Sequence, residues 1–313
     1  MNYYNQVFLM YKNFFEKLRI LDGGMGQELH ARGLISKGTL WSTSAILDEK
    51  YHNIVVDTHM AYIDAGAEVI ITNNFSSRRI RMEQNKVNHL FEFANKKACE
   101  LAIKAKKKSN KEIIIGGSIP AQNDTYKEDI REDNIIYKAF DEQVICIKDY
   151  IDLFYLDVLS SGREIGIASD VIDEYKKPIL VGIHLNKNGK LPSGETITEV
   201  VNKYKHSSWV GIIASCVSME IAENSISELK KQNLPFGYKV NLWGDDEPSP
   251  QREINTAKYN EDAVNLNTVM GKKEVAYETF KNLGKKFIDN GATLLGGCCE
   301  TNPDHIKILS SLK

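Results

Sequence analysis

The sequence has little of what marks a membrane, secreted or nucleic-acid-binding protein. No apolar run in its 313 residues approaches the roughly 18 residues of a membrane span, and residues 1–4 lack the basic-then-apolar order of a signal peptide. It has five cysteines, an odd number without the spacing of a small disulfide scaffold. The net charge of -2 excludes a global basic field for nucleic acid. We therefore expect a cytoplasmic protein that binds neither membranes nor nucleic acid.

Short apolar runs alternate with helix-length amphipathic stretches along the chain. The runs are rich in β-branched residues and show little polar alternation, which is typical of strands buried on both faces. They span residues 19–21, 68–71, 113–115, 153–156, 179–183, 210–213, 236–240 and 293–295. Eight strand–helix repeats in about 300 residues predict a single (β/α)8 TIM barrel. An open doubly wound sheet is the alternative, but residues 22–26 do not fit its usual GxGxxG phosphate loop.

Two segments of the single predicted domain, residues 1–313, fall outside this repeat. Residues 1–18 are predicted as an N-terminal helical extension, because apolar side chains recur at helical spacing within 6–18. Residues 242–271 form a long polar connection after the seventh run, on the face where such barrels carry their sites. A long loop there is often a lid, and an insertion without a role is an equal alternative.

The residues that follow the apolar runs define the candidate site, because active sites of such barrels lie at the carboxyl ends of the strands. These residues are Asp22, Gly23, Gly24, Asn73, Asn74, Phe75, Ser118, Asp157, His184, Cys216, Asn241, Cys298 and Cys299. Carboxylate, amide, hydroxyl and thiol groups are therefore expected together at the end of the barrel where the strands have their carboxyl ends.

Three of the five cysteines belong to this set. The other two, Cys99 and Cys146, fall in helical patterns and are interpreted as small core residues. Thiolates that converge from the sixth and eighth strands suit zinc. Cys216, Cys298 and Cys299 are therefore predicted to bind one Zn²⁺, with unrelated thiols as the alternative. A disulfide within the adjacent pair is disfavoured because it requires strained geometry.

Several motifs, taken together and in order, resemble the homocysteine S-methyltransferase family. They are LDGGMG at 21–26 with Glu28 and Leu29, LWS at 40–42, TNNF at 72–75 with Arg79, LPSGE at 191–195, and GGCC at 296–299 with Thr301, Pro303, His305 and Ile306. The family includes betaine–homocysteine and S-methylmethionine–homocysteine methyltransferases. The resemblance implies a zinc enzyme that transfers a methyl group from a small sulfonium or betaine donor to the thiol of homocysteine, giving methionine.

The resemblance also implies roles for individual residues. The three cysteines Cys216, Cys298 and Cys299 match the zinc ligands of the family. The residues expected to bind substrates are Asp22, Gly23, Gly24, Trp41, Asn73, Phe75, Ser118 and Asp157. Among them, the opening-motif residues and the acidic residue after the fourth strand hold the amino acid portion of homocysteine. A thiol that enters the open fourth position of such a zinc ion loses its proton and becomes a nucleophile.

The donor pocket is less defined by the sequence. Trp41 and Phe75 are candidates for cation–π contact with a sulfonium or quaternary ammonium group, and ordinary packing is the alternative for both. Arg78, Arg79 and Arg163 are candidates to pair with a donor carboxylate, although charged residues at helix starts are most often solvated.

The sequence departs from the family pattern at positions beside the expected site. Asp157-Val158 stands where the family usually has Glu-Thr, Ser215 where it usually has Asn, and Glu300 where a small residue is usual. Three alternatives therefore remain open: a different thiol or selenol acceptor, a corrinoid partner as donor, and a non-catalytic zinc- or thiol-binding relative. The identity of the donor and the oligomeric state are undetermined at this level.

Overall fold

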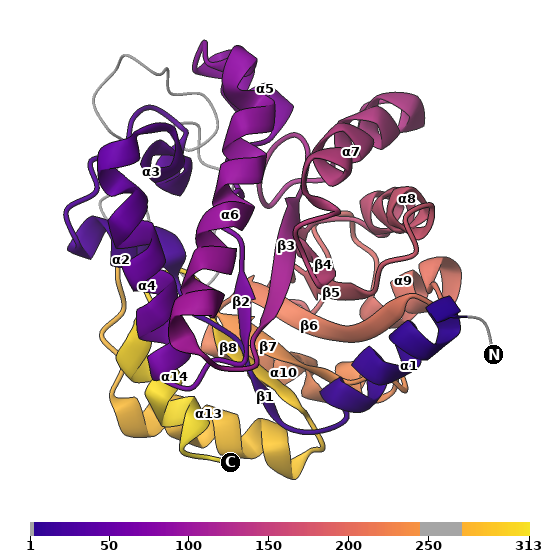
Figure 1. Cartoon of the computed structure of the whole chain (residues 1–313). Coiled ribbons are helices and arrows are strands. Elements are labelled where there is room, and N and C mark those ends of the chain that lie inside the picture. The colour runs from indigo at the N-terminus through magenta and orange to yellow at the C-terminus, as the bar shows by residue number, and fades with distance from the viewer. Residues whose placement is uncertain (1–2, 245–270) are drawn as a thin grey trace.

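The computed structural model describes residues 3–244 and 271–313. Its eight parallel strands follow the order β1-β8-β7-β6-β5-β4-β3-β2. A parallel bridge between Leu21 and Val69 joins the β1 and β2 edges and closes the barrel. Helices surround the strands (Figure 1), so the predicted (β/α)8 barrel is confirmed. The greater part of the 242–271 segment lies outside the described residues, and its role as a lid stays a prediction.

The strands are short and almost fully buried, as expected for a parallel sheet covered by helices. They are β1 (Arg19–Ile20), β2 (Val69–Ile71), β3 (Ile114–Pro120), β4 (Leu153–Leu159), β5 (Ile179–Ile183), β6 (Trp209–Val217), β7 (Phe236–Val240) and β8 (Leu294–Gly297). The helices are α1 (Tyr3–Phe15), α2 (Met25–Ala31), α3 (Ser44–Leu47), α4 (His52–Asp64), α5 (Arg79–Gln84), α6 (Phe91–Ser109), α7 (Asp133–Ile147), α8 (Gly162–Asp173), α9 (Ile197–Tyr204), α10 (Met219–Lys230), α13 (Tyr277–Asp289) and α14 (Pro303–Ser310).

Four strands, β3, β4, β6 and β8, extend beyond the ends predicted from their apolar runs. Ser118, Asp157 and Cys216 lie inside β3, β4 and β6, so the prediction that they follow these strands is wrong. The register between β4 and β5 shifts beyond Leu156, and the register between β6 and β7 shifts around Cys216. Bulges of this kind re-aim a side chain near a site. Polar residues within these strands therefore still serve the mouth of the barrel.

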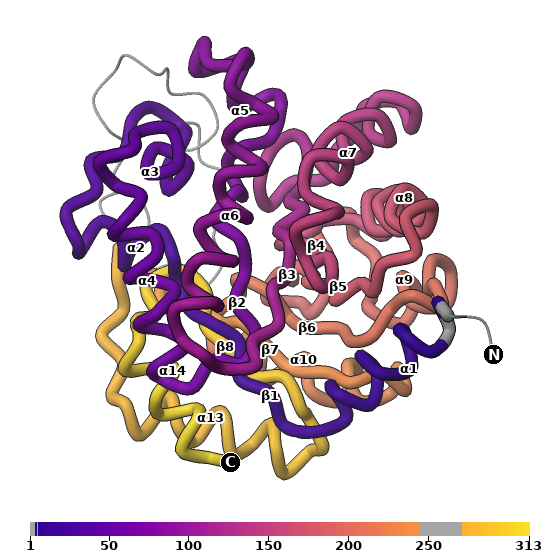
Figure 2. Tube along the Cα trace, viewed as in Figure 1, coloured from indigo at the N-terminus to yellow at the C-terminus, as the bar shows by residue number. Residues whose placement is uncertain are grey.

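A small cluster of apolar side chains fills the inside of the barrel. It contains alternate residues of the strands, such as Val69 and Ile71 of β2 and Leu153 of β4, as the two-residue period of a strand requires. Phe15 and Tyr11 of α1 pack into the same cluster and are buried. The helix therefore covers the end of the barrel where the strands begin, and it lies beside β6 (Figure 2). It begins and ends three residues earlier than the predicted 6–18 segment.

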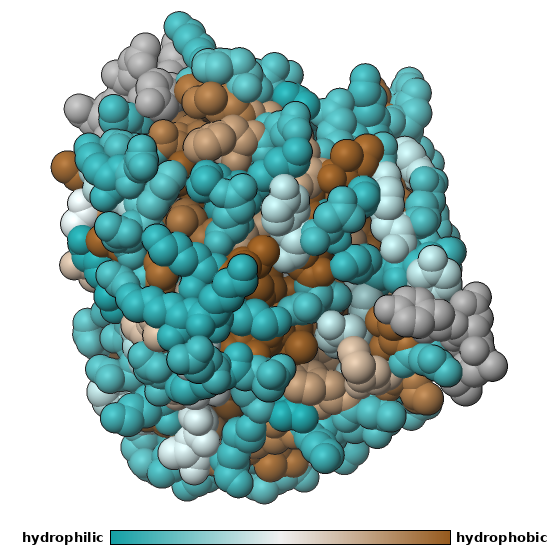
Figure 3. Space-filling model, in the orientation of Figure 1, coloured by the Kyte–Doolittle hydropathy of each residue, from teal (hydrophilic) through white to brown (hydrophobic). Residues whose placement is uncertain are grey.

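The visible surface in Figure 3 is largely hydrophilic, with hydrophobic residues in small groups. Large exposed apolar side chains occur at separate places, such as Met10 on α1, Ile35 before α3 and Ile130 before α7. Among the described residues, none of the helices has both the length and the apolarity needed to cross a membrane.

A buried carboxyl group lies in the first turn of α8. Glu164 Oε2 accepts a hydrogen bond from Ser161 Oγ at 2.7 Å and one from the Asp129 N–H at 3.4 Å. Its Oε1 has no hydrogen-bond partner among the described residues. Burial raises the pKa of Glu164 to about 7, although these two hydrogen bonds partly oppose the shift.

Replacing Glu164 by glutamine is expected to remove a pH dependence of stability. Between about pH 4.5 and about pH 7 the folded protein keeps a proton that the unfolded chain releases, so the free energy of unfolding falls as pH rises. The variant should match the wild type near about pH 4 and exceed it by up to about 3 kcal/mol near about pH 8. Urea unfolding at both pH values measures this. Glu220→Gln, in the exposed first turn of α10, is the control, and an unchanged pH profile for Glu164→Gln would contradict the assignment.

Candidate metal and substrate site

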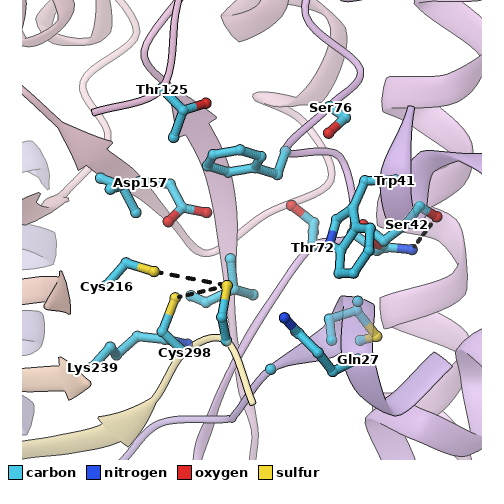
Figure 4. Close-up of a pocket in the computed structure, with 18 of the residues that line it drawn as sticks. Gln27, Trp41, Ser42, Thr72, Ser76, Thr125, Asp157, Cys216, Lys239 and Cys298 are labelled. Atoms are coloured by element: carbon cyan, nitrogen blue, oxygen red, sulfur yellow. Dashed lines mark hydrogen bonds between the residues drawn. The ribbon is translucent and has the colours of Figure 1, made fainter. Parts of the chain in front are cut away.

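Three cysteine side chains converge at the carboxyl ends of β6 and β8 (Figure 4). Cys299 Sγ lies 3.8 Å from Cys216 Sγ and 4.0 Å from Cys298 Sγ, and all three sulfurs lie within 4.8 Å of one another. Tetrahedral zinc with Zn–S bonds of about 2.3 Å would hold its sulfur ligands about 3.8 Å apart. The structure therefore brings the three predicted cysteines together at a spacing that suits a metal ion.

The closing motif holds the cysteine pair through backbone hydrogen bonds. The Cys298 N–H donates to Val240 O at 2.7 Å, and Thr301 Oγ1 donates to Cys298 O at 2.6 Å. The Gly24 N–H donates in turn to Thr301 O and Oγ1, both at 3.1 Å, which ties the opening motif to the closing one. A Cβ on Gly297 would lie 2.1 Å from Thr301 Oγ1. This close approach explains the glycine before the cysteines.

Cys216 occupies a special backbone position with an unusual set of donors. Its φ of 52° lies in the left-handed region, which non-glycine residues adopt rarely. Asn241 Nδ2 donates a hydrogen bond to Cys216 O at 2.7 Å, and the Tyr126 hydroxyl lies 3.2 Å from Cys216 Sγ. Burial alone raises the pKa of Cys216, but hydrogen bonds from the two other cysteines and from Tyr126 outweigh it and lower the pKa well below the ordinary value. The cluster thus favours a thiolate at this position.

Tyr126 and Trp243 were not identified from the sequence. The Tyr126 ring lies 4.5 Å from the His184 ring and meets the Trp243 ring edge-on at 5.8 Å, measured between centroids. Both tyrosine and tryptophan are in connections between elements, where no periodic pattern indicates which way a side chain points. His184, a member of the strand-end set, contacts Ser215 O through Nδ1 at 3.3 Å. It supports the tyrosine ring and does not join the cysteine cluster.

Asp22 is buried and already has partners. Its Oδ2 accepts the Ile71 N–H at 2.7 Å, and its Oδ1 accepts a hydrogen bond from Lys239 Nζ. Burial raises the pKa of Asp22. Burial also disfavours the ammonium of Lys239, but the contact with Asp22 outweighs it and raises the pKa of Lys239 above its ordinary value. The proton therefore stays on Lys239. Lys239 was not identified from the sequence, and the signal that could have identified it is a single lysine within the apolar run 236–240.

Asp157 projects into the cavity and is supported by Ser118. Ser118 Oγ donates to Asp157 Oδ2 at 2.7 Å, and the Ser118 N–H donates to Thr72 Oγ1 at 3.0 Å. Burial, followed by the charge of Cys298, raises the pKa of Asp157 to about 7. Ser118 is not in the cavity wall itself, so the structure places it behind Asp157.

The Trp41 segment is fixed against the first and second βα connections. Asn73 Nδ2 donates to Ser42 O at 3.1 Å. A Cβ on Gly26 would lie 2.0 Å from the Trp41 Nε1, so the glycine allows the indole to lie against α2. Phe75 contacts the guanidinium of Arg78, whose Cζ lies 5.2 Å from the ring centroid. Phe75, one of the two aromatic residues predicted to contact the cationic donor group, therefore already has a cationic neighbour within the protein.

One cavity collects nearly all of the predicted site residues. Its wall includes Asp22, Gly23, Gly24, Trp41, Asn73, Phe75, Asp157, Cys216, Cys298 and Cys299. Figure 4 shows Trp41 and Ser42 across the cavity from Asp157 and the cysteines. The cavity thus joins a thiol cluster, a buried carboxyl group and an aromatic wall.

The fold and this cavity define a (β/α)8 protein with a cluster of three cysteines, suited to holding a metal ion, at the carboxyl face of its strands. Over residues 19–312 the sequence matches the family described as homocysteine S-methyltransferase. The chain belongs to this family, as its motifs predicted.

Relatives of known name span almost the same length. The chain is 24% identical to homocysteine S-methyltransferase 2 of Saccharomyces cerevisiae, covering 95% of this chain and 94% of that protein. It is 22% identical to homocysteine S-methyltransferase 1 of Arabidopsis thaliana, covering 93% and 92%. The metallated crystal structure of the homocysteine methyltransferase MmuM from Escherichia coli superposes with a TM-score of 0.76 at 20% identity, covering 95% and 96%. This structural likeness supports the same barrel fold.

Proposed function

We propose that this protein is a zinc-dependent homocysteine S-methyltransferase. It transfers a methyl group from a small sulfonium or betaine donor to the homocysteine thiol and forms methionine. The convergence of three cysteine sulfurs on a cavity that also contains Asp157 and Trp41 carries the proposal. Family membership over residues 19–312 supports the reaction type.

The cysteine cluster fits zinc by ligand type as well as by spacing. Three soft thiolates that leave one position open are a known zinc donor set. When bound, the ion would accept the substrate thiol at that position and hold it deprotonated at neutral pH. Cys216, Cys298 and Cys299 would hold the ion. The Tyr126 hydroxyl, 3.2 Å from Cys216 Sγ, would donate a hydrogen bond to that sulfur.

The remaining residues of the cavity bind and orient the two substrates. Asp157, held by Ser118, provides a carboxylate for the ammonium group of homocysteine. The Gly23 N–H, which has no acceptor among the described residues, provides a donor for its carboxylate. Asp22 keeps this region in place through Ile71 and Lys239. Trp41 provides an aromatic face for the cationic group of the donor.

The experiment is methionine formation from homocysteine by zinc-loaded protein, with S-methylmethionine, S-adenosylmethionine, glycine betaine and dimethylsulfoniopropionate as donors. We expect turnover with at least one donor and loss of turnover after the metal is removed. Undiminished activity in metal-free protein would refute the zinc mechanism. Selenohomocysteine and cysteine serve as comparison acceptors, because Asp157 in place of the usual glutamate makes another acceptor the second candidate.

We also propose small-molecule partners and a cytoplasmic location for this protein. A single domain of 313 residues with an N-terminal helical extension also remains our interpretation.

A further inference from the structure

Arg78 places a buried positive charge in the cavity wall. Its side chain is 1% exposed, and it lines the same cavity as the cysteine cluster. One Nη donates to Ala121 O, and the other donates to Thr125 Oγ1 at 2.8 Å. Both acceptors are neutral. Its Nε has no hydrogen-bond partner among the described residues, and no described carboxylate lies within ion-pair distance of the guanidinium.

Neighbouring arginines show the ordinary arrangement. Arg79 pairs with Glu142 at 2.9 Å, and Arg163 pairs with Asp133 at 2.6 Å. Neither of these two arginines lines the cavity. Arg78 alone among the three arginines considered from the sequence combines full burial, a place in the cavity wall and neutral partners.

A buried guanidinium without an anion is costly. Burial and then the charge of Arg81 lower the pKa of Arg78, and the charges of Asp124 and Asp157, from beyond ion-pair distance, only partly oppose this. Arginine retains its proton in proteins, so direct contacts have to compensate the charge. Buried charges are normally paired. A buried charge that faces a substrate cavity and has N–H donors to spare therefore indicates that an anionic ligand group completes its surroundings.

The position of Arg78 assigns that anion to the methyl donor. Its partner Thr125 lies on the side of the cavity away from Lys239 and Cys298 (Figure 4). Homocysteine has a short side chain, so with its sulfur at the cysteines its amino acid portion stays near Asp157. The donor must present its methyl group to the same sulfur, and the rest of the donor extends toward Thr125. Arg81, buried in the same wall, adds a second positive charge there.

We propose that Arg78, together with Thr125, binds the carboxylate of the methyl donor, so that the donor is a small onium compound with a carboxylate at its other end. This inference rests on the proposed methyl transfer. The Trp41 face receives the onium group, and Phe75 packs against the guanidinium and fixes its orientation. Arg78 is thereby a residue that determines donor specificity.

The test compares two ligands that differ only in charge, dimethylsulfoniopropionate and its primary amide. Isothermal titration of zinc-loaded protein without homocysteine measures binding with no transfer reaction. The wild type should bind the carboxylate at least about tenfold more tightly than the amide, as expected for hydrogen bonds between charged groups. Arg78→Met should bind both ligands equally weakly. Arg79→Met, which changes the adjacent arginine outside the cavity, should keep the preference.

The wild-type comparison does not depend on how well any variant folds, and circular dichroism checks the variants. Equal affinity of the wild type for both ligands, no binding of either, or a preserved preference in Arg78→Met would each overturn the assignment. Homocysteine affinity is measured in parallel and should be unchanged in Arg78→Met. Failure of homocysteine to bind the wild type would count against the proposed function, whereas the carboxylate preference tests the donor site separately.

Discussion

Replacing Cys298 by serine is expected to abolish stable metal binding and to lower kcat/KM for methyl transfer by at least about a thousandfold. Cys298 Sγ lies 4.0 Å from Cys299 Sγ within the cluster. A serine hydroxyl keeps the size of the side chain but replaces a soft thiolate with a weak neutral ligand. Changes to outer-shell partners of a metal typically cost 10–100-fold, so the loss of a direct ligand should cost more.

The measurements are zinc content by mass spectrometry and methionine formation with the best donor. Cys146→Ser is the matched control, because Cys146 is a buried thiol on α7 that donates to Glu142 O at 3.2 Å and belongs to neither the cluster nor the cavity wall. The control should retain one zinc ion per chain and full activity. A Cys298→Ser protein that keeps both zinc and activity would show that the cluster is not the catalytic centre.

The barrel was predictable because its signals are local and repeated. Each strand is a short apolar run, and the two-sided burial of a parallel sheet leaves that run nearly free of polar residues. The strand ends were less predictable. The apolar run predicts that β6 ends at Ile213, but the strand continues to Val217 with a bulge at Cys216. Whether a polar residue ends a strand or occupies a bulge depends on pairing with the neighbouring strand, which the run itself does not contain.

The cysteine site was predictable because three residues of one rare type occur at strand ends. Its supporting residues were not. Tyr126 lies in the connection after β3 and reaches Cys216 across the mouth of the barrel, so its role depends on the closure of the barrel. Arg78, Arg79 and Arg163 are equivalent in the sequence, and only the structure shows that Arg78 is buried in the cavity wall. Which of these side chains reaches the site depends on contacts between segments that are far apart in the sequence.

Replacing Lys239 by methionine is expected to lower the free energy of unfolding by about 3–5 kcal/mol, the usual cost of removing one partner from a buried ion pair. Lys239 and Asp22 are almost completely buried, and Lys239 Nζ donates to Asp22 Oδ1. Methionine preserves the apolar stem but leaves the Asp22 carboxylate buried without its counter-ion. Urea unfolding at neutral pH measures the change. Lys286→Met, which removes an exposed pair with Glu223 on the surface, is the control and should change stability little.

The double variant Asp22→Asn with Lys239→Met separates the charge from the packing. Asparagine keeps an oxygen that can accept the Ile71 N–H and carries no charge, so the buried site becomes neutral. If the cost of Lys239→Met comes from the uncompensated carboxylate, the double variant should regain most of the lost stability, and the two substitutions should be strongly non-additive. Additive losses would instead show that Lys239 contributes through packing inside the barrel.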